Sequence, residues 1–273
     1  AAMWEYRRWP WFFKSGGEGS GLFVSHDAGE TWTQRTSKDG LPEGQLGRIG
    51  LAIAPSHPNV VYALVENKEK NALYRSDDGG VKWTRISDAE DIGNRPFYYS
   101  EIYVDPFREN TVYSLWTLVT KSDDGGRSWK NMGLRASKQI AKVIVDPMDF
   151  NVVYVAALGD LWAAGGERGV YKTTDGGLTW NRVLHVDDDT GATELVMDPS
   201  NNKTLYAASY QRRRQQWGMN GGGPGSAIWK STDAGQTWNK LDSGVPAGAK
   251  GGFYPKKLAG LSREDFQDRK SVV

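Results

Sequence analysis

Ser76-Asp77-Asp78-Gly79-Gly80-Val81-Lys82-Trp83 decides the fold of this chain, because its pattern recurs at four other places. The pattern is Ser or Thr, any residue, Asp, any residue, Gly, two further residues and Trp. Its five copies end at Trp32, Trp83, Trp129, Trp180 and Trp238, so the steps between them are 51, 46, 51 and 58 residues. A repeat of this length indicates one structural unit copied along the chain.

Each copy of this pattern, an Asp box, predicts a β-hairpin. A run such as Ala72-Leu73-Tyr74-Arg75 leads into the turn, and a second run leaves through the tryptophan. The Asp can accept hydrogen bonds from turn N–H groups, and the Trp can bury a large ring. An active site is usually built once, whereas a folding device is repeated. We therefore interpret the repeated residues as structural, not as metal ligands or paired catalytic acids: Asp27, Trp32, Asp78, Trp83, Asp124, Trp129, Asp175, Trp180, Asp233 and Trp238.

Two further strands precede the hairpin in each complete unit. In the fourth unit, Val143-Ile144-Val145 ends at Asp146-Pro147 and is followed by Val152-Val153-Tyr154-Val155-Ala156. Runs of β-branched and aromatic residues favour strands, and proline marks strand ends. Four antiparallel strands every 46–58 residues predict an all-β fold, a β-propeller of four-stranded blades. A solenoid of parallel strands is the alternative.

The repeats divide the chain into five expected blades and a tail. The blades are expected at 1–46, 47–93, 94–137, 138–188 and 189–242, and an irregular C-terminal tail is expected at 243–273. The first blade shows no candidate for an inner strand. We therefore expect a piece of a larger propeller rather than a closed five-bladed ring.

Composition narrows the possible partners and cofactors. The chain has 34 basic and 33 acidic residues, so no overall field favours nucleic acid. It has no cysteine, and its three histidines show no metal-ligand spacing, so we expect neither a metal nor another cofactor. No apolar run approaches the roughly 20 residues that span a membrane. The first residues do not resemble a signal peptide.

The variable insertions are the expected place for function, because loops on a rigid scaffold often carry binding residues. Two insertions match, each with adjacent arginines, a nearby Trp and a Gly-rich return. Such residues bind carboxylates and stack on ligands, or alternatively pack over the blades. With the loop at 159–168, they give these binding candidates: Arg7, Arg8, Trp9, Trp11, Trp162, Arg168, Arg212, Arg213, Arg214 and Trp217. The catalytic candidates are Asp160, Glu167, Tyr98 and Tyr99.

The five boxes resemble the Asp-box, or BNR, repeat of sialidases, xyloglucan-degrading propeller hydrolases, a photosystem assembly factor and sortilin-type receptors. The resemblance covers about residues 1–242, and blocks such as Val153-Tyr154-Val155-Ala156-Ala157-Leu158-Gly159 are most similar to bacterial sortilin-like propeller proteins. Arg48-Ile49-Gly50 lacks the proline of the sialidase Arg-Ile-Pro motif, so we transfer no sialidase residues. The resemblance implies an exported protein, located outside the cell, at its surface or in the periplasm.

The leading functional prediction is a non-catalytic exported β-propeller. It would bind a protein, peptide or glycan through the loops opposite the Asp boxes. One alternative is a glycoside hydrolase acting on a polysaccharide, which needs two carboxylates about 5–10 Å apart. Another is a structural subunit of an envelope or cell-surface assembly.

Overall fold

The computed structural model describes residues 1–88, 92–93 and 100–242. The tail expected at 243–273 and the candidates Tyr98 and Tyr99 lie outside the described residues. The chain divides into two compact units. Unit 1 comprises Ala1–Gly133 with Pro147–Phe150, and unit 2 comprises Leu134–Asp146 with the chain from Asn151 onward.

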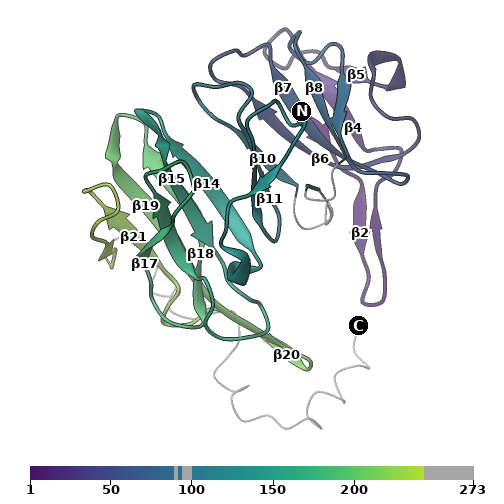
Figure 1. The fold of residues 1–273 in the computed structure, drawn as a ribbon. Coiled ribbons are helices and arrows are strands. Elements are labelled where there is room, and N and C mark those ends of the chain that lie inside the picture. Colours follow the sequence, from purple (N-terminus) through teal and green to yellow (C-terminus); the bar gives the residue numbers. More distant parts are fainter. Residues whose placement is uncertain (89–91, 94–99, 243–273) are drawn as a thin grey trace. The chain divides into compact units, whose positions relative to one another are not determined.

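The sheets of unit 1 follow the order of the sequence, with each strand bonded to the next (Figure 1). The first sheet has three strands, β1 (Ala2–Met3), β4 (Gly21–Val24) and β5 (Thr33–Arg35). The second has four, β6 (Leu46–Ile53), β7 (Val61–Asn67), β8 (Ala72–Ser76) and β9 (Thr84–Ser87). The third also has four, β10 (Glu101–Val104), β11 (Val112–Leu115), β12 (Val119–Ser122) and β13 (Lys130–Asn131). A short 3-10 helix, η1 (Ser37–Asp39), follows β5.

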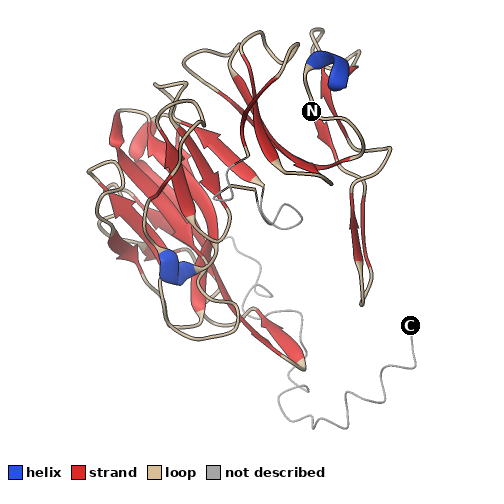
Figure 2. Cartoon of the chain, turned by 45° about the vertical axis from the view of Figure 1, so that its right-hand side comes forward, coloured by secondary structure: helices blue, strands red, loops and turns tan. Residues whose placement is uncertain are grey.

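The remaining two sheets repeat the same plan. One contains β14 (Ile140–Asp146), β15 (Asp149–Ala157), β16 (Gly169–Thr173) and β17 (Asn181–Leu184). The other contains β18 (Thr190–Asp198), β19 (Asn201–Gln215), β21 (Ala227–Ser231) and β22 (Asn239–Lys240). A 3-10 helix, η2 (Arg135–Ser137), precedes β14. The regular secondary structure of the described residues is thus almost entirely strand, as predicted (Figure 2).

Two hairpins extend beyond these sheets. In unit 1, β2 (Tyr6–Arg8) pairs only with β3 (Phe13–Ser15), with Arg7 opposite Lys14. In unit 2, the end of β19 pairs with β20 (Gly218–Gly221), with Arg213 opposite Asn220. Figure 1 shows each as a ribbon that projects from its own unit. Both correspond to the matched insertions of the sequence.

A repeated tyrosine connects neighbouring sheets within each unit. Tyr62 and Tyr154 are both 0% exposed in the second strand of their sheets. The hydroxyl of Tyr62 donates to the carbonyl of Glu109 at 2.8 Å, and that of Tyr154 donates to the carbonyl of Ala234 at 2.9 Å. Each acceptor lies in the following repeat. The ring therefore fills the core while its polar end satisfies a backbone group of the next sheet.

The described part of the chain was compared with the length and apolarity that a membrane-spanning helix needs. None of its helices is long and apolar enough to cross a bilayer.

Candidate functional site

The carboxylate of each Asp box bonds within its own turn. Oδ1 of Asp78 accepts the hydroxyl of Ser76 at 2.7 Å and the backbone N–H groups of Val81 and Lys82 at 3.0 and 2.9 Å. Hydrogen bonds of this kind favour the ionised form. Those from Ser128 come first in lowering the pKa of Asp124 to about 2, and those from Thr237 come first in lowering the pKa of Asp233 to about 2.

The other boxes use the same bonds. The pKa values of Asp27, Asp78 and Asp175 are also lowered by hydrogen bonds within their turns. Among the residues that the structure describes, no group of three or more His, Asp or Glu side chains is placed to hold a metal ion. The geometry therefore gives all five aspartates a role in closing hairpins.

The box tryptophans differ in burial. Trp83 is 5% exposed and packs in a cluster with Leu22 and Leu41, whereas Trp32 is 51% exposed. Trp129, Trp180 and Trp238 are half-buried. Leu22 and Leu41 belong to the preceding repeat, and they pack against Trp83. No described sheet precedes that of Trp32.

Arg168 organises the loop between β15 and β16, and it does so from a buried position. It is 0% exposed, and its guanidinium donates to the carbonyls of Gly165 at 2.9 Å and Leu158 at 2.8 Å. It also donates to the carbonyls of Asp160 and Ala163. Burial lowers the pKa of Arg168, while the negative charge of Asp189 opposes that shift. Arg168 was predicted to bind a ligand. That prediction is wrong, because the side chain is buried and its donors are bonded to carbonyls of its own loop.

The catalytic candidates of this loop, Asp160 and Glu167, also form hydrogen bonds or ion pairs within the protein. Oδ2 of Asp160 lies 2.6 Å from Nζ of Lys138, and its Oδ1 accepts the N–H of Trp162 at 2.8 Å. Burial alone would raise the pKa of Asp160, but the bonds from Lys138 and Trp162 outweigh it and lower the pKa. Oε2 of Glu167 accepts the N–H groups of Ala136 at 2.8 Å and Ser137 at 3.2 Å in η2. Each carboxylate thereby connects the loop to the segment before β14.

The arginines of the β19–β20 hairpin mostly contact the same unit. Arg212 bonds to the side-chain oxygen of Gln139, and Arg213 forms an ion pair with Asp189. Arg214 lies 5.6 Å from the centre of the Trp162 ring. Trp162 and Trp217 are 57% and 65% exposed. The structure therefore brings Arg212, Arg213, Arg214 and Trp162 to one loop cluster, with Trp217 at the turn between β19 and β20.

The arginines of the β2–β3 hairpin contact aromatic rings instead. Arg7 lies 5.5 Å from the ring centre of Trp9, and Arg8 lies 5.6 Å from that of Phe13. Trp11 is 82% exposed. The candidates Arg7, Arg8, Trp9 and Trp11 thus share one ribbon.

A further polar cluster, centred on Arg48, is missing from the sequence-based candidates. Nη2 of Arg48 pairs with Oε1 of Glu101 at 2.8 Å, and the backbone N–H of Arg48 donates to Oε2 of Glu66 at 2.8 Å. Its guanidinium lies 5.5 Å from the centre of the Trp4 ring. The hydroxyl of Ser15 donates to Glu66. We call Arg48, Glu66 and Glu101 the Arg48 cluster.

The sequence held one signal for this cluster. Four residues after the repeated tyrosine of the second strand stand Glu66, Thr117, Leu158 and Tyr210, so only one repeat has an acid there. A residue that departs from a structural repeat is a candidate for function, by the same reasoning that makes the Asp boxes structural. Glu101 gives a weaker signal, because Glu194 occupies the same place five residues before the strand-ending proline.

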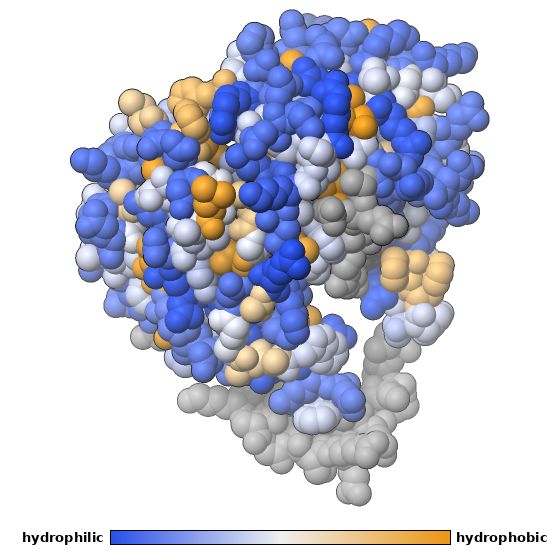
Figure 3. All heavy atoms as spheres, in the orientation of Figure 1, coloured by the Kyte–Doolittle hydropathy of each residue, from blue (hydrophilic) through white to orange (hydrophobic). Residues whose placement is uncertain are grey.

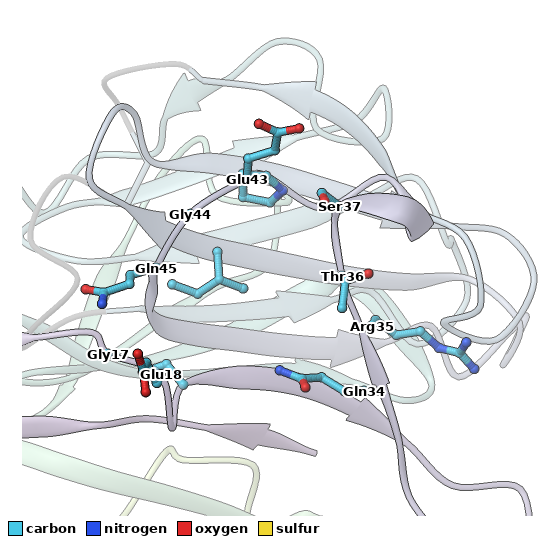
Figure 4. Close-up of a pocket in the computed structure, with 12 residues that line it drawn as sticks. Gly17, Glu18, Gln34, Arg35, Thr36, Ser37, Glu43, Gly44 and Gln45 are labelled. Carbon is cyan, nitrogen blue, oxygen red and sulfur yellow. The ribbon is translucent and has the colours of Figure 1, made fainter.

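Unit 1 also contains a pocket of about 480 Å³ (Figure 4). Gln34 and Arg35 at the end of β5 line one side, and Glu43 and Gln45 before β6 line another. Figure 4 shows the side chains of Arg35 and Glu43 pointing in different directions. They do not converge on one ligand position, and we assign the pocket no role.

Comparison with known proteins agrees with the repeat and with the fold. The family model for the BNR/Asp-box repeat matches residues 23–34, and the model for Sortilin-Vps10 (sortilin, neurotensin receptor 3) matches residues 117–250. A crystal structure of a GH74 enzyme from Niastella koreensis is similar, with a TM-score of 0.52 and 21% identity over 83% of this chain and 37% of that one. The chain thus carries the Asp-box, or BNR, repeat and has the fold of β-propeller proteins, which confirms the predicted resemblance and fold class.

The curated relatives that match most of this chain are named as xyloglucanases. A probable oligoxyloglucan-reducing end-specific xyloglucanase of Neosartorya fischeri is 23% identical over 88% of this chain and 33% of its own length. A xyloglucanase of Hypocrea jecorina is 25% identical over 76% of this chain and 27% of its own. The chain thus spans about a third of the length of these relatives.

These relatives correct the leading functional prediction. A non-catalytic binding propeller was expected, but the proteins that match most of this chain are xyloglucanases. The prediction was wrong because Asp boxes are common to enzymes and receptors and do not discriminate between them. The similarity favours the alternative, a glycoside hydrolase.

Proposed function

We propose that this chain forms part of a glycoside hydrolase that cleaves a polysaccharide of the xyloglucan type. The observation that carries the proposal is the similarity to xyloglucanases, which extends over 88% of the chain in one relative. A polysaccharide substrate would also agree with the predicted location outside the cell, at its surface or in the periplasm.

Glu66 and Glu101 are the carboxylates that we assign to the reaction. Most glycosidases use two acidic side chains, one to protonate the leaving oxygen and one as nucleophile or base. Glu101 pairs with Arg48, which suits an ionised nucleophile or base, and its side chain is 33% exposed. Oε2 of Glu66 accepts two hydrogen bonds, while its Oε1 meets no donor among the described residues. Glu66 is therefore the second acidic side chain of the proposed pair.

Asp160 and Glu167 fit this role less well. Asp160 is paired with Lys138, and Glu167 binds two N–H groups of η2. We expect their loss to change the stability of the loop at 158–168 before it changes chemistry.

The test compares acids that occupy equivalent positions. Glu101→Gln and Glu66→Gln should each lower kcat on xyloglucan by at least about 100-fold. Glu194→Gln is the matched control, because Glu194 pairs with Lys142 at 3.3 Å as Glu101 pairs with Arg48. Release of reducing sugar by the purified protein measures the rate.

Three outcomes would contradict parts of the proposal. No hydrolysis by the unaltered protein would remove the enzymatic function. Equal losses of kcat from Glu101→Gln and Glu194→Gln would indicate that both glutamates serve only in structural ion pairs. Loss of turnover with Asp160→Asn or Glu167→Gln, at unchanged stability, would move the catalytic acids to unit 2.

A further inference from the structure

The β2–β3 hairpin exposes a set of aromatic rings. Tyr6 is 58% exposed, Trp11 82%, Phe12 57% and Phe13 43%. Figure 3, drawn in the orientation of Figure 1, shows apolar side chains gathered where that hairpin lies. Contiguous apolar surface of this kind marks a binding site more often than a chance exposure. We call Trp4, Tyr6, Trp9, Trp11, Phe12 and Phe13 the aromatic surface.

Five of the six rings of the aromatic surface contact another of its rings. Trp4 stacks on Tyr6 with 4.2 Å between ring centres. Phe12 stacks on Trp9 at 5.9 Å and on Phe13 at 6.4 Å. Nε1 of Trp4 also donates to the hydroxyl of Ser15 at 3.0 Å. A ligand would therefore meet rings whose positions are already fixed, which lowers the entropy cost of binding.

The arginines of this hairpin remain available to a ligand. Within the described part of the chain, Arg7 and Arg8 contact rings and no carboxylate. In the β19–β20 hairpin, by contrast, Arg213 is paired with Asp189 and Arg212 with Gln139. The N–H groups of Arg7 and Arg8 can donate to oxygen atoms of a bound molecule, beside rings that present apolar faces.

The aromatic surface reaches the Arg48 cluster. Trp4 lies beneath the guanidinium of Arg48, and Ser15 bonds both to Trp4 and to Glu66. A linear ligand that follows the rings would thus pass from the hairpin to the two carboxylates. At the end of this path, Glu66 and Glu101 would repel an anionic headgroup, whereas they can accept the hydroxyl groups of a neutral chain.

We propose that the aromatic surface binds the chain of a xyloglucan-type polysaccharide and leads it to Glu66 and Glu101. The inference rests on the proposed function. Sugar rings offer an apolar face that stacks on Trp11 and Phe12, and they carry hydroxyl groups that accept from Arg7 and Arg8. The hairpin is a binding element for long substrates, and a short oligosaccharide held at the carboxylates does not need it.

The test removes two exposed rings without disturbing the core. Trp11→Ser with Phe12→Ser should weaken binding of xyloglucan about tenfold, measured by affinity electrophoresis in the Glu101→Gln background, where the expected loss of kcat limits turnover. Phe107→Ser is the control, because Phe107 is 48% exposed in the same unit and lies outside the hairpin. In the active protein, the double variant should raise KM for the polymer, whereas Phe107→Ser should not.

The outcomes separate this inference from the proposed function. Unchanged polymer binding by the double variant, at an unchanged melting temperature, would overturn the inference even if the enzyme is active. So would hairpin-dependent binding to phosphatidylserine vesicles without binding to xyloglucan. Hairpin-dependent xyloglucan binding without hydrolysis by the unaltered protein would support the binding surface and remove the proposed enzymatic function.

Discussion

Nη2 of Arg48 and Oε1 of Glu101 lie 2.8 Å apart, and this pair joins β6 to β10, the first strands of two successive sheets. Lys142 and Glu194 form a similar pair between β14 and β18, at 3.3 Å. The two pairs differ in their surroundings, because Arg48 also contacts Trp4 and Glu66. The Lys142–Glu194 pair therefore serves as the structural reference for the Arg48–Glu101 pair in tests of the proposed function.

Replacement of Arg48 should affect the reaction more than the fold. We expect Arg48→Met to lower kcat/KM on xyloglucan by about 100-fold, because Glu101 loses its charge partner, while the backbone N–H that donates to Glu66 remains. Lys142→Met should change kcat/KM less than about twofold. Steady-state kinetics at matched melting temperatures would measure both. Equal effects from the two substitutions would indicate that the pairs serve only to connect sheets.

The Asp boxes should make stability depend on pH in the acid range. Hydrogen bonds to the carboxylates of Asp124 and Asp233 lower their pKa values to about 2, against about 3.9 in an unfolded chain. The folded state then binds fewer protons, so this stabilisation is fully present above about pH 4 and is lost as the pH falls toward 2. The melting temperature, followed from pH 6 to pH 2, should fall in that window. In Asp124→Asn the fall should be smaller, and an identical profile would contradict the assignment.

The two tryptophans Trp83 and Trp32 should differ in their contribution to stability. Trp83 is 5% exposed, so Trp83→Ala should cost about 3–5 kcal/mol in the free energy of unfolding. Trp32 is 51% exposed, and Trp32→Ala should cost less than about 1 kcal/mol. Urea titration of the unaltered protein, Trp83→Ala and Trp32→Ala would measure these free energies of unfolding. A loss below about 1 kcal/mol at Trp83 would place its ring outside the core.

We expect Arg168 to stabilise the loop between β15 and β16. Arg168→Met leaves the carbonyls of Leu158, Asp160, Ala163 and Gly165 without their donor, which should cost about 3 kcal/mol or more. Arg168→Lys should restore only part of this, since an ammonium group lacks the planar array of donors. Hydrogen exchange of residues 158–168 should accelerate in both variants. Unchanged exchange would contradict the role assigned to the guanidinium.

The repeated features of the molecule could be predicted from the sequence. The hairpins at the Asp boxes depend on residues at most seven positions apart, as from Ser76 to Trp83, so local chemistry defines them. The same holds for the strands that end at the repeated prolines. These patterns were sufficient for the fold class.

The candidate site was largely beyond sequence reasoning, because it depends on contacts between distant residues. Arg48 and Glu101 are 53 positions apart, and Ser15 and Glu66 are 51 apart. Arg168 was predicted to bind a ligand, since the sequence does not reveal that four carbonyls surround it. Burial of an arginine can be inferred only once its loop has been placed.

The Asp78 carboxylate and the Trp83 indole nitrogen find their partners within eight consecutive residues. A gene segment that encodes such an octapeptide can therefore be duplicated in tandem without compensating substitutions elsewhere for those bonds. Selection is then free to alter single repeats, as at Glu66, while the copies around it preserve the scaffold.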